Sequence, residues 1–400
     1  MSDLKKLVVI LGLGRSGTST FARALRIFGV DLGDNLTPAE IGVNDKGFFE
    51  DEDFLAINRE MLAYLRTDWS YASDIPIPEK KVDALIEQGF FERAVNLALV
   101  KMSGKEFYAF KDGRTTKLIP FWNAVFEKCN LDQLRYLIVV RNPISVAKSY
   151  QKYSKIDEKL TYLLWTGFML AALKGSEQRK RVLSDYDRLI KNPGREIARI
   201  GRHLDLEVNQ VEMEDFENNF IDRNLQHTTY AENDITENDE IPGITKELYL
   251  GLLKISSDEV RLDSEEFQIS LEKWIDEYAK FEATFGFIDD LCLRHEKMQM
   301  ELSKMAETHG EQLAQMGKAH GEQLAQMAEI QGECARLKEI EFKLQAELAL
   351  LERVNAQAKH VKVAQDRKIQ EIMGSRSMRL TSALRSGANL LRKLRKSIFS

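Results

Sequence analysis

Cysteine, histidine and long apolar runs are all scarce in this sequence. Its three cysteines, Cys129, Cys292 and Cys334, are widely spaced and form neither a CxxC pair nor a metal-ligand pattern, which indicates a reducing compartment. The six histidines show no HExxH or similarly paired spacing. The sequence therefore predicts neither a disulfide framework nor a metal site.

The longest apolar stretch after the N-terminal run, Tyr162–Leu173, falls short of the roughly 20 residues that a membrane-spanning helix needs. The N-terminal run is interrupted by glycines and by Arg15 too early for a signal peptide. With 44% apolar residues and a net charge of −6, the chain can bury a core and is unlike a general nucleic-acid binder. We expect a cytoplasmic protein without a transmembrane segment.

A further absence concerns the stretch LGLGRSGTSTFARAL, which begins at Leu11 and nearly completes a nucleotide-binding phosphate loop. If Gly12 and Gly17 are the glycines of the G-x-x-x-x-G-K-[ST] pattern, Thr18 stands where its lysine should be. That lysine offsets the dense charge of a nucleoside triphosphate. Arg15 is the only cation of this loop, so we expect a donor with less charge at its transferred end, such as a phosphosulfate.

Short apolar runs that suit buried parallel strands alternate with helical patterns. The runs cover residues 7–11, 107–110 and 134–140, and a fourth strand begins at Arg181. It is followed by a helix with Asn192 as N-cap. This alternation predicts an α/β fold with a P-loop-NTPase-like parallel sheet flanked by helices over residues 1–250, and a helical extension over 251–290.

The composition changes after residue 290. An 11-residue sequence, HGEQLAQMGKA, is repeated almost unchanged at residues 320–330, and a stripe of Leu and Met keeps its spacing. We predict an oligomerising coiled coil over 291–372, with a helical hairpin within one chain as the alternative. The tail, 373–400, is basic with one apolar helical face, which is typical of a helix lying on an anionic membrane; a partner protein or nucleic acid is the alternative.

Two short motifs stand directly after predicted strands. RSGTS follows the first strand, and VVRNPISVAKSY supplies an Arg followed eight residues later by a Ser. Both resemble motifs of the sulfotransferases that use 3′-phosphoadenosine 5′-phosphosulfate (PAPS), whose first motif has the form [RK]-S-G-T-[ST]. The resemblance implies that the first motif binds the phosphosulfate and the second binds the 3′-phosphate. The residues so assigned are Arg15, Ser16, Gly17, Thr18 and Ser19 in the first motif and Arg141 and Ser149 in the second.

The resemblance extends over about residues 7–250. NDKGFFED at residues 44–51, FKDGRTTKLIPFW and YDRLIKNP are similar to segments of the bacterial members, in the same order. In this family Tyr186 of the last segment would contact the adenine. Arg223 and His227 resemble a late bacterial segment without an assigned role.

Sulfuryl transfer requires a base for the acceptor hydroxyl and cations for the leaving phosphate. Gly113 stands where small-molecule members of the family commonly have a histidine base, so Glu50 is the candidate base. Lys111 and Arg15 are the candidates that stabilise the transferring charge. A solvated carboxylate at Glu50 and a strand-end salt bridge at Lys111 are the structural alternatives.

The segment SRSMRLTSALR, at residues 375–385, is similar to an ending found on bacterial enzymes that assemble surface polysaccharides. It implies a glycan or lipid-linked saccharide as acceptor, modified at the cytoplasmic membrane face, with PAPS as co-substrate and no metal. Two other functions fit the same residues: a P-loop nucleotide-dependent kinase, and a non-catalytic coiled-coil assembly factor for glycan enzymes.

Overall fold

The computed structural model describes residues 6–40, 42, 44–131, 133–221, 230, 232–316 and 323–374, and divides the chain into two units, 1–298 and 299–400. The strands are β1 (Lys6–Leu11), β2 (Phe107–Lys111), β3 (Gln133–Val140) and β4 (Lys180–Asp185). The helices of the first half are α1 (Thr18–Leu25), η1 (Arg26–Phe28), α2 (Glu52–Tyr64), α3 (Glu79–Glu87), α4 (Phe90–Lys101), α5 (Gly113–Lys117), α6 (Ile119–Lys128) and α7 (Pro143–Ser154). Those of the second half are α8 (Glu158–Gly175), α9 (Tyr186–Lys191), α10 (Pro193–Leu204), α11 (Gln210–Asp215), η2 (Phe216–Phe220), α12 (Glu232–Thr236), α13 (Gly243–Ser256), α14 (Glu265–Ala279), α15 (Glu282–Met316) and α16 (Gln323–Gly374).

The first unit is organised around a parallel four-stranded sheet with the strand order β2-β1-β3-β4. Val8 of β1 pairs with Ala109 of β2 on one side and with Arg135 of β3 on the other. The strands are buried along almost their whole length, which explains why their sequences are continuous apolar runs rather than alternating ones. The predicted α/β class with a parallel sheet is confirmed.

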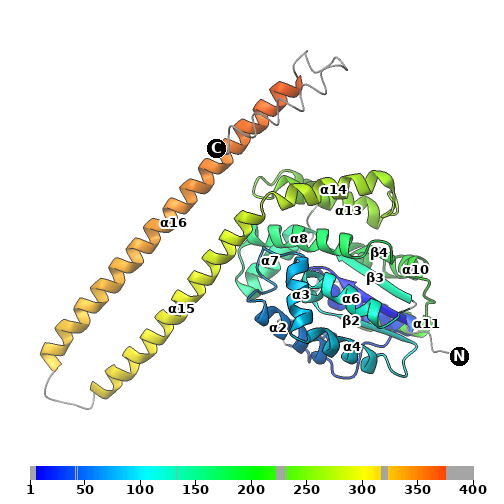
Figure 1. Ribbon diagram of the computed structural model, residues 1–400, viewed down its shortest axis with the longest axis horizontal. Coiled ribbons are helices and arrows are strands. Elements are labelled where there is room, and N and C mark those ends of the chain that lie inside the picture. The colour runs from blue at the N-terminus through cyan, green and yellow to red at the C-terminus, as the bar shows by residue number, and fades with distance from the viewer. Residues whose placement is uncertain are drawn as a thin grey trace. The chain divides into compact units, whose positions relative to one another are not determined.

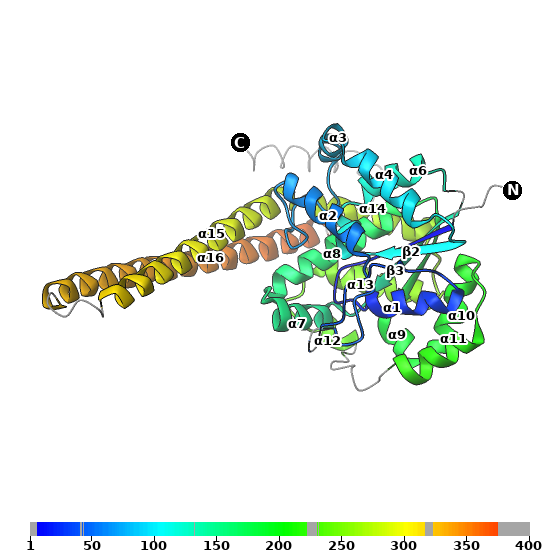
Figure 2. The ribbon, with the colours of Figure 1, turned by 90° about the horizontal axis from the view of Figure 1, so that it is seen from below.

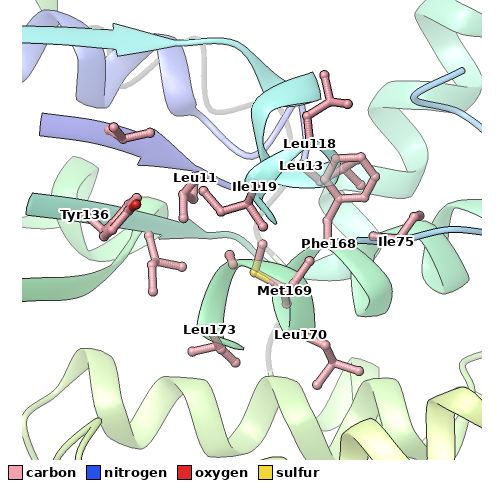
Figure 3. Close-up of a cluster of buried hydrophobic side chains, with 14 of the residues drawn as sticks. Leu11, Leu13, Ile75, Leu118, Ile119, Tyr136, Phe168, Met169, Leu170 and Leu173 are labelled. Atoms are coloured by element: carbon pink, nitrogen blue, oxygen red, sulfur yellow. The ribbon is translucent and has the colours of Figure 1, made fainter. Parts of the chain in front are cut away.

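Helices cover both faces of this sheet (Figures 1 and 2). Alternate side chains of β1 point to opposite faces: Val8 and Ile10 pack with α1, α10 and α11, whereas Leu7, Val9 and Leu11 pack with the larger core on the other face. Figure 3 shows part of this larger core, where side chains of α8 meet those that follow β1 and α5. The result is a three-layer α/β/α unit in which the carboxyl ends of the parallel strands lie at one edge of the sheet.

Local sequence signals determine where individual helices begin and end. Asn192 caps α10 by accepting a hydrogen bond from the backbone of Arg195, and Pro193 occupies the first helical position. Gly29 ends the first helical segment in the left-handed conformation, at φ 70°. The cap at Asn192 agrees with the sequence-based prediction.

Helices α13 and α14 contribute to the main core through Leu248, Leu252 and Leu271. The predicted boundary between residues 250 and 251 therefore falls within α13. None of the helices among the residues that the structure describes is long and apolar enough to cross a membrane.

The second unit contains the end of α15 and the whole of α16. His309 of α15 and Glu333 of α16 approach within 3.6 Å, so the two helices are neighbours at this point. Several apolar side chains of α16 are exposed in the single chain: Leu337, Ile340, Phe342, Leu348, Leu351 and Val354. The oligomeric coiled coil stays a prediction, and residues 375–400 of the predicted basic tail lie outside the described residues.

Candidate functional site

The carboxyl ends of all four strands border one pocket of about 550 Å³. Its walls include Leu13 after β1, Lys111 at the end of β2, Arg141 after β3 and Tyr186 after β4. Ligands of open α/β sheets bind at this edge, because the loops that follow the strands converge there. The pocket is therefore the first candidate for a functional site.

The loop between β1 and α1 forms the floor of the pocket, and its glycines are required by close approaches. At Gly12, φ is +145° and a side-chain carbon would lie 2.7 Å from the carbonyl oxygen of Val139. At Gly17, φ is +89° and a side-chain carbon would lie 2.1 Å from the ring of Tyr186. Only glycine fits such positions. Because these two glycines have no side chain, the backbone of the loop can lie close to a ligand in the pocket.

This loop leads into the N-terminus of α1, which has the properties of an anion site. Gly17 is the N-cap and has no side chain, so no side-chain cap binds the first N–H groups of α1, which belong to pocket-lining residues. The hydroxyl of Ser16 is buried and has no hydrogen-bond partner among the described residues. Thr18 and Ser19 line the pocket, whereas Ser16 lies beneath its surface. These unfilled donors fit a phosphate or sulfate group.

The two motifs that resemble sulfotransferase sequences contact each other here. Arg15 donates from Nε to the hydroxyl of Ser149 over 2.9 Å, and Arg141 donates from its guanidinium to the backbone carbonyl of Arg15 over 3.2 Å. The guanidinium of Arg141 also lies 4.4 Å from the ring centroid of Tyr186, and its Nε is buried without a partner among the described residues. Two arginines, a hydroxyl and an aromatic ring thus surround one part of the pocket.

Electrostatics in this part of the pocket favour an anionic ligand. Burial lowers the pKa of Arg15, and the nearby charge of Arg141 lowers it further, against the opposing effect of Tyr150 and Tyr153. Seven basic and four acidic residues line the whole pocket, although the chain carries a net charge of −6. The basic ones are Arg15, Lys46, Lys111, Arg114, Arg141, Lys148 and Lys152. An anion bound here would relieve the repulsion between the two arginines.

Glu50 and Lys111 form an ion pair beside the phosphate loop, with 2.6 Å between Oε1 and Nζ. The side chains are 16% and 4% exposed, so the pair is largely withdrawn from solvent but opens to the pocket. Lys111 also donates to the hydroxyl of Ser19 over 3.2 Å, and Asn44 approaches the same hydroxyl at 3.2 Å. A carboxylate and an ammonium group thus lie next to the anion-binding loop.

The position of Glu50 is set by the next residue, Asp51. Asp51 caps α2, and its buried carboxylate accepts a hydrogen bond from Tyr108 and pairs with Lys101 at 2.8 Å. The bonds of Asp51 fix the backbone at the start of α2, directly after Glu50. This arrangement explains how an acidic run, GFFEDED, can hold one carboxylate against the pocket rather than in solvent.

All the candidate residues that the sequence suggests are therefore brought to this one edge of the sheet. Sequence reasoning missed other side chains that line the pocket, among them Trp69, Arg114, Tyr150 and Tyr153. Tyr153 lies four residues after Ser149 on α7 and could have been found from the helical spacing, whereas nothing in the sequence around Trp69 indicates a site. Residues Arg223 and His227 lie outside the described residues.

No protein-family model matches the sequence, and no curated protein matches it. The solved structures that are similar to the chain include two sulfotransferase domains. The sulfotransferase domain from the Synechococcus PCC 7002 olefin synthase has 15% sequence identity and a TM-score of 0.33, with 68% of this chain and 94% of that domain covered. The sulfotransferase domain from the curacin biosynthetic pathway has 13% identity and a TM-score of 0.31, with 64% and 97% covered.

Proposed function

We propose that this protein is a PAPS-dependent sulfotransferase that modifies a hydroxyl of a glycan or lipid-linked saccharide. The observation that carries the proposal is the contact between the two motifs. Arg15 and Ser149, which are 134 residues apart, form a hydrogen bond, and Arg141 contacts the same loop. Together they surround a helix N-terminus that lacks the lysine of a triphosphate site.

The donor-binding residues divide into two groups. The N–H groups of Gly17 and Thr18 and the hydroxyls of Thr18 and Ser19, which line the pocket, suit the 5′-phosphosulfate. Arg141 and Ser149 suit the 3′-phosphate, with the ring of Tyr186 against the adenine. PAPS supplies an activated sulfuryl group with a phosphate as its leaving group.

The ion pair between Glu50 and Lys111 suits the transfer step. The acceptor oxygen forms a bond to sulfur while the bond from sulfur to the leaving phosphate oxygen breaks, and Glu50 receives the hydroxyl proton. Once protonated, Glu50 no longer attracts Lys111 strongly. The ammonium of Lys111 is then available to stabilise the negative charge on the leaving oxygen.

Replacing the proposed base tests this assignment. In Glu50→Gln we expect a loss of sulfuryl transfer of about 10²- to 10⁴-fold, since an amide cannot accept the proton. The measurement follows labelled sulfate from PAPS into a glycan and glycolipid extract. Glu40→Gln, a change at another acid that lines the pocket, is the matched control. Near-normal transfer by Glu50→Gln would remove Glu50 from this role.

One observation favours a second candidate function, a nucleotide-dependent kinase. Lys111 reaches Ser19 of the phosphate loop from a different strand, and an ammonium there could also stabilise a nucleoside triphosphate. A requirement for ATP and magnesium would favour the kinase. Among the described residues, no group of three or more His, Cys, Asp or Glu side chains is placed to hold a metal ion.

We further propose that the protein forms a homo-oligomer through the predicted coiled coil of residues 291–372. The exposed apolar side chains of α16 support this arrangement, because a second helix would remove them from water. The basic tail would bring the enzyme to the anionic cytoplasmic face of the membrane, where a lipid-linked saccharide is accessible.

A further inference from the structure

The wall segment, residues 68–77 between α2 and α3, has no regular secondary structure and contributes the side chain of Trp69 to the lining of the pocket. Trp69 of this wall segment lines the pocket and stacks on Tyr150 of α7, with 5.2 Å between ring centroids and 28° between ring planes. Such a pair presents a flat aromatic surface to a ligand. The stacking of Trp69 on Tyr150 therefore fixes the position of this aromatic surface.

Tyr150 places this wall next to the reactive groups. Its hydroxyl lies against Gly14 of the phosphate loop, where a side-chain carbon would be only 2.4 Å away. Burial raises the pKa of Tyr150; Arg15 and Arg114 act to lower it, and Glu50 acts to raise it. The charges of both Arg15, the cation on the donor side, and Glu50, the proposed base, therefore act on Tyr150. Trp69, Tyr150 and Glu50 line the same pocket.

A buried lysine organises the wall segment from one side. Lys117 of α5 is fully buried, and its ammonium donates to three backbone carbonyls, those of Asp68 at 2.9 Å, Tyr71 at 2.9 Å and Ser73 at 3.0 Å. Burial lowers the pKa of Lys117 to about 8, which leaves the ammonium form dominant at neutral pH. Its three N–H groups therefore satisfy three carbonyls that no sheet or helix could satisfy.

A buried carboxylate also binds the backbone of this segment. Asp289 of α15 accepts hydrogen bonds from the backbone N–H groups of Ala72 and Ser73, each over 2.8 Å. Lys117 and Asp289 thus bind the carbonyls and the amides of one short segment, in place of the regular pairing of secondary structure. Apolar packing adds to this clamp, since Ile75 lies beside Phe168 in the buried cluster of Figure 3.

We propose that Lys117 and Asp289 are positioning residues that hold Trp69 as the acceptor wall of the pocket. The role of this wall in acceptor binding rests on the proposed function, whereas the clamp formed by the hydrogen bonds of Lys117 and Asp289 does not. Because both polar partners are buried and multiply bonded, the wall has one fixed shape and selects acceptors by their fit to the aromatic surface.

Hydrogen exchange of the full chain tests the clamp. In wild-type protein we expect the N–H groups of Ala72 and Ser73 to be protected. In Lys117→Met and in Asp289→Asn they should exchange at least tenfold faster, with the sheet unaffected. The matched control is Arg181→Met, which removes another buried cation that donates to backbone carbonyls and lies at the far end of its strand from the pocket. Unchanged exchange in the wall segment of both clamp variants would overturn the proposal.

Two further outcomes are decisive. If Lys117→Met and Arg181→Met accelerate exchange in the same way throughout the sheet, Lys117 serves general stability and the positioning role is wrong. The second readout is calorimetric binding of 3′-phosphoadenosine 5′-phosphate, the desulfated donor, which should stay within threefold of wild type in Asp289→Asn. A selective loss of this binding would assign the wall to the donor side. A wild-type protein that binds no such nucleotide contradicts the proposed function but leaves the exchange result valid.

Discussion

At the scale of the residue, Asp185 shows how the edge of the sheet tolerates a buried charge. Asp185 ends β4, and one of its carboxylate oxygens accepts the backbone N–H of Arg188 as the N-cap of α9. The other oxygen is buried without a hydrogen-bond partner among the described residues. Burial raises the pKa of Asp185 to about 7, and the nearby charges of Asp187 and Glu196 add to the effect.

This shift predicts a pH-dependent cost in stability. The unfolded chain releases this proton near pH 4 and the folded chain near pH 7, so the stabilisation from Asp185 is complete below pH 4 and is lost as the pH rises to 7. Asparagine keeps the helix cap and cannot ionise. We expect Asp185→Asn to match wild type in free energy of unfolding near pH 4 and to exceed it at pH 7, by about 4 kcal/mol at most.

Denaturant unfolding at the two pH values measures this difference. Asp157→Asn is the control, because Asp157 caps α8 in the same way but is exposed to solvent. An Asp185→Asn variant with the same stability advantage at both pH values would show that the proton is not involved.

At the scale of the element, the phosphate loop depends on a glycine at the N-terminus of α1. A side-chain carbon at Gly17 would overlap the ring of Tyr186, whereas one at Gly29, which has a similar positive φ of +70°, would meet no atom within 4 Å. Comparing the same substitution at the two glycines therefore separates the effect of backbone strain from that of a steric clash in the pocket.

We expect Gly17→Ala to weaken binding of 3′-phosphoadenosine 5′-phosphate by more than tenfold, because the displaced ring takes with it the aromatic contact of Arg141. Gly29→Ala should lose a comparable amount of stability to strain, of order 1 kcal/mol, and keep its nucleotide affinity. Calorimetric titration and thermal unfolding of both variants compare these effects. Equal affinities in the two variants would show that Tyr186 does not border the ligand.

The elements differ in how far the sequence predicts them. The strands could be predicted because each is an uninterrupted apolar run, and α10 because Asn192 and Pro193 are local signals. The wall segment could not, because its backbone is held by Lys117, a residue 49 positions from Asp68, and no local pattern encodes such a contact. The candidate site was predictable where a motif is contiguous, as in Arg15–Ser19, and was missed at Trp69.

At the scale of the whole molecule, the second unit presents an apolar seam that one chain leaves exposed. Leu337, Ile340, Leu344, Leu351 and Val354 recur on α16 at the spacing of a heptad seam. A helix with such a seam is stabilised by burying it against another helix. We therefore expect the protein to self-associate through α16.

We expect Leu351→Glu to convert the full-length protein to smaller species in sedimentation velocity, because a charge in the seam is costly to bury. Gln345→Glu adds the same charge at an exposed position outside the seam and should leave the assembly intact. A wild-type chain that sediments as a monomer would contradict the oligomer.

The central claim is that the pocket at the carboxyl edge of the sheet binds a 3′-phosphorylated nucleotide. Calorimetric titration of the full chain with 3′-phosphoadenosine 5′-phosphate, ADP, and ATP with magnesium tests it most directly. The account predicts selective binding of the 3′-phosphorylated nucleotide, weakened about ten- to a hundredfold in Arg141→Ala by the loss of a charged hydrogen bond. A preference for ATP with magnesium, or no nucleotide binding at all, would contradict it.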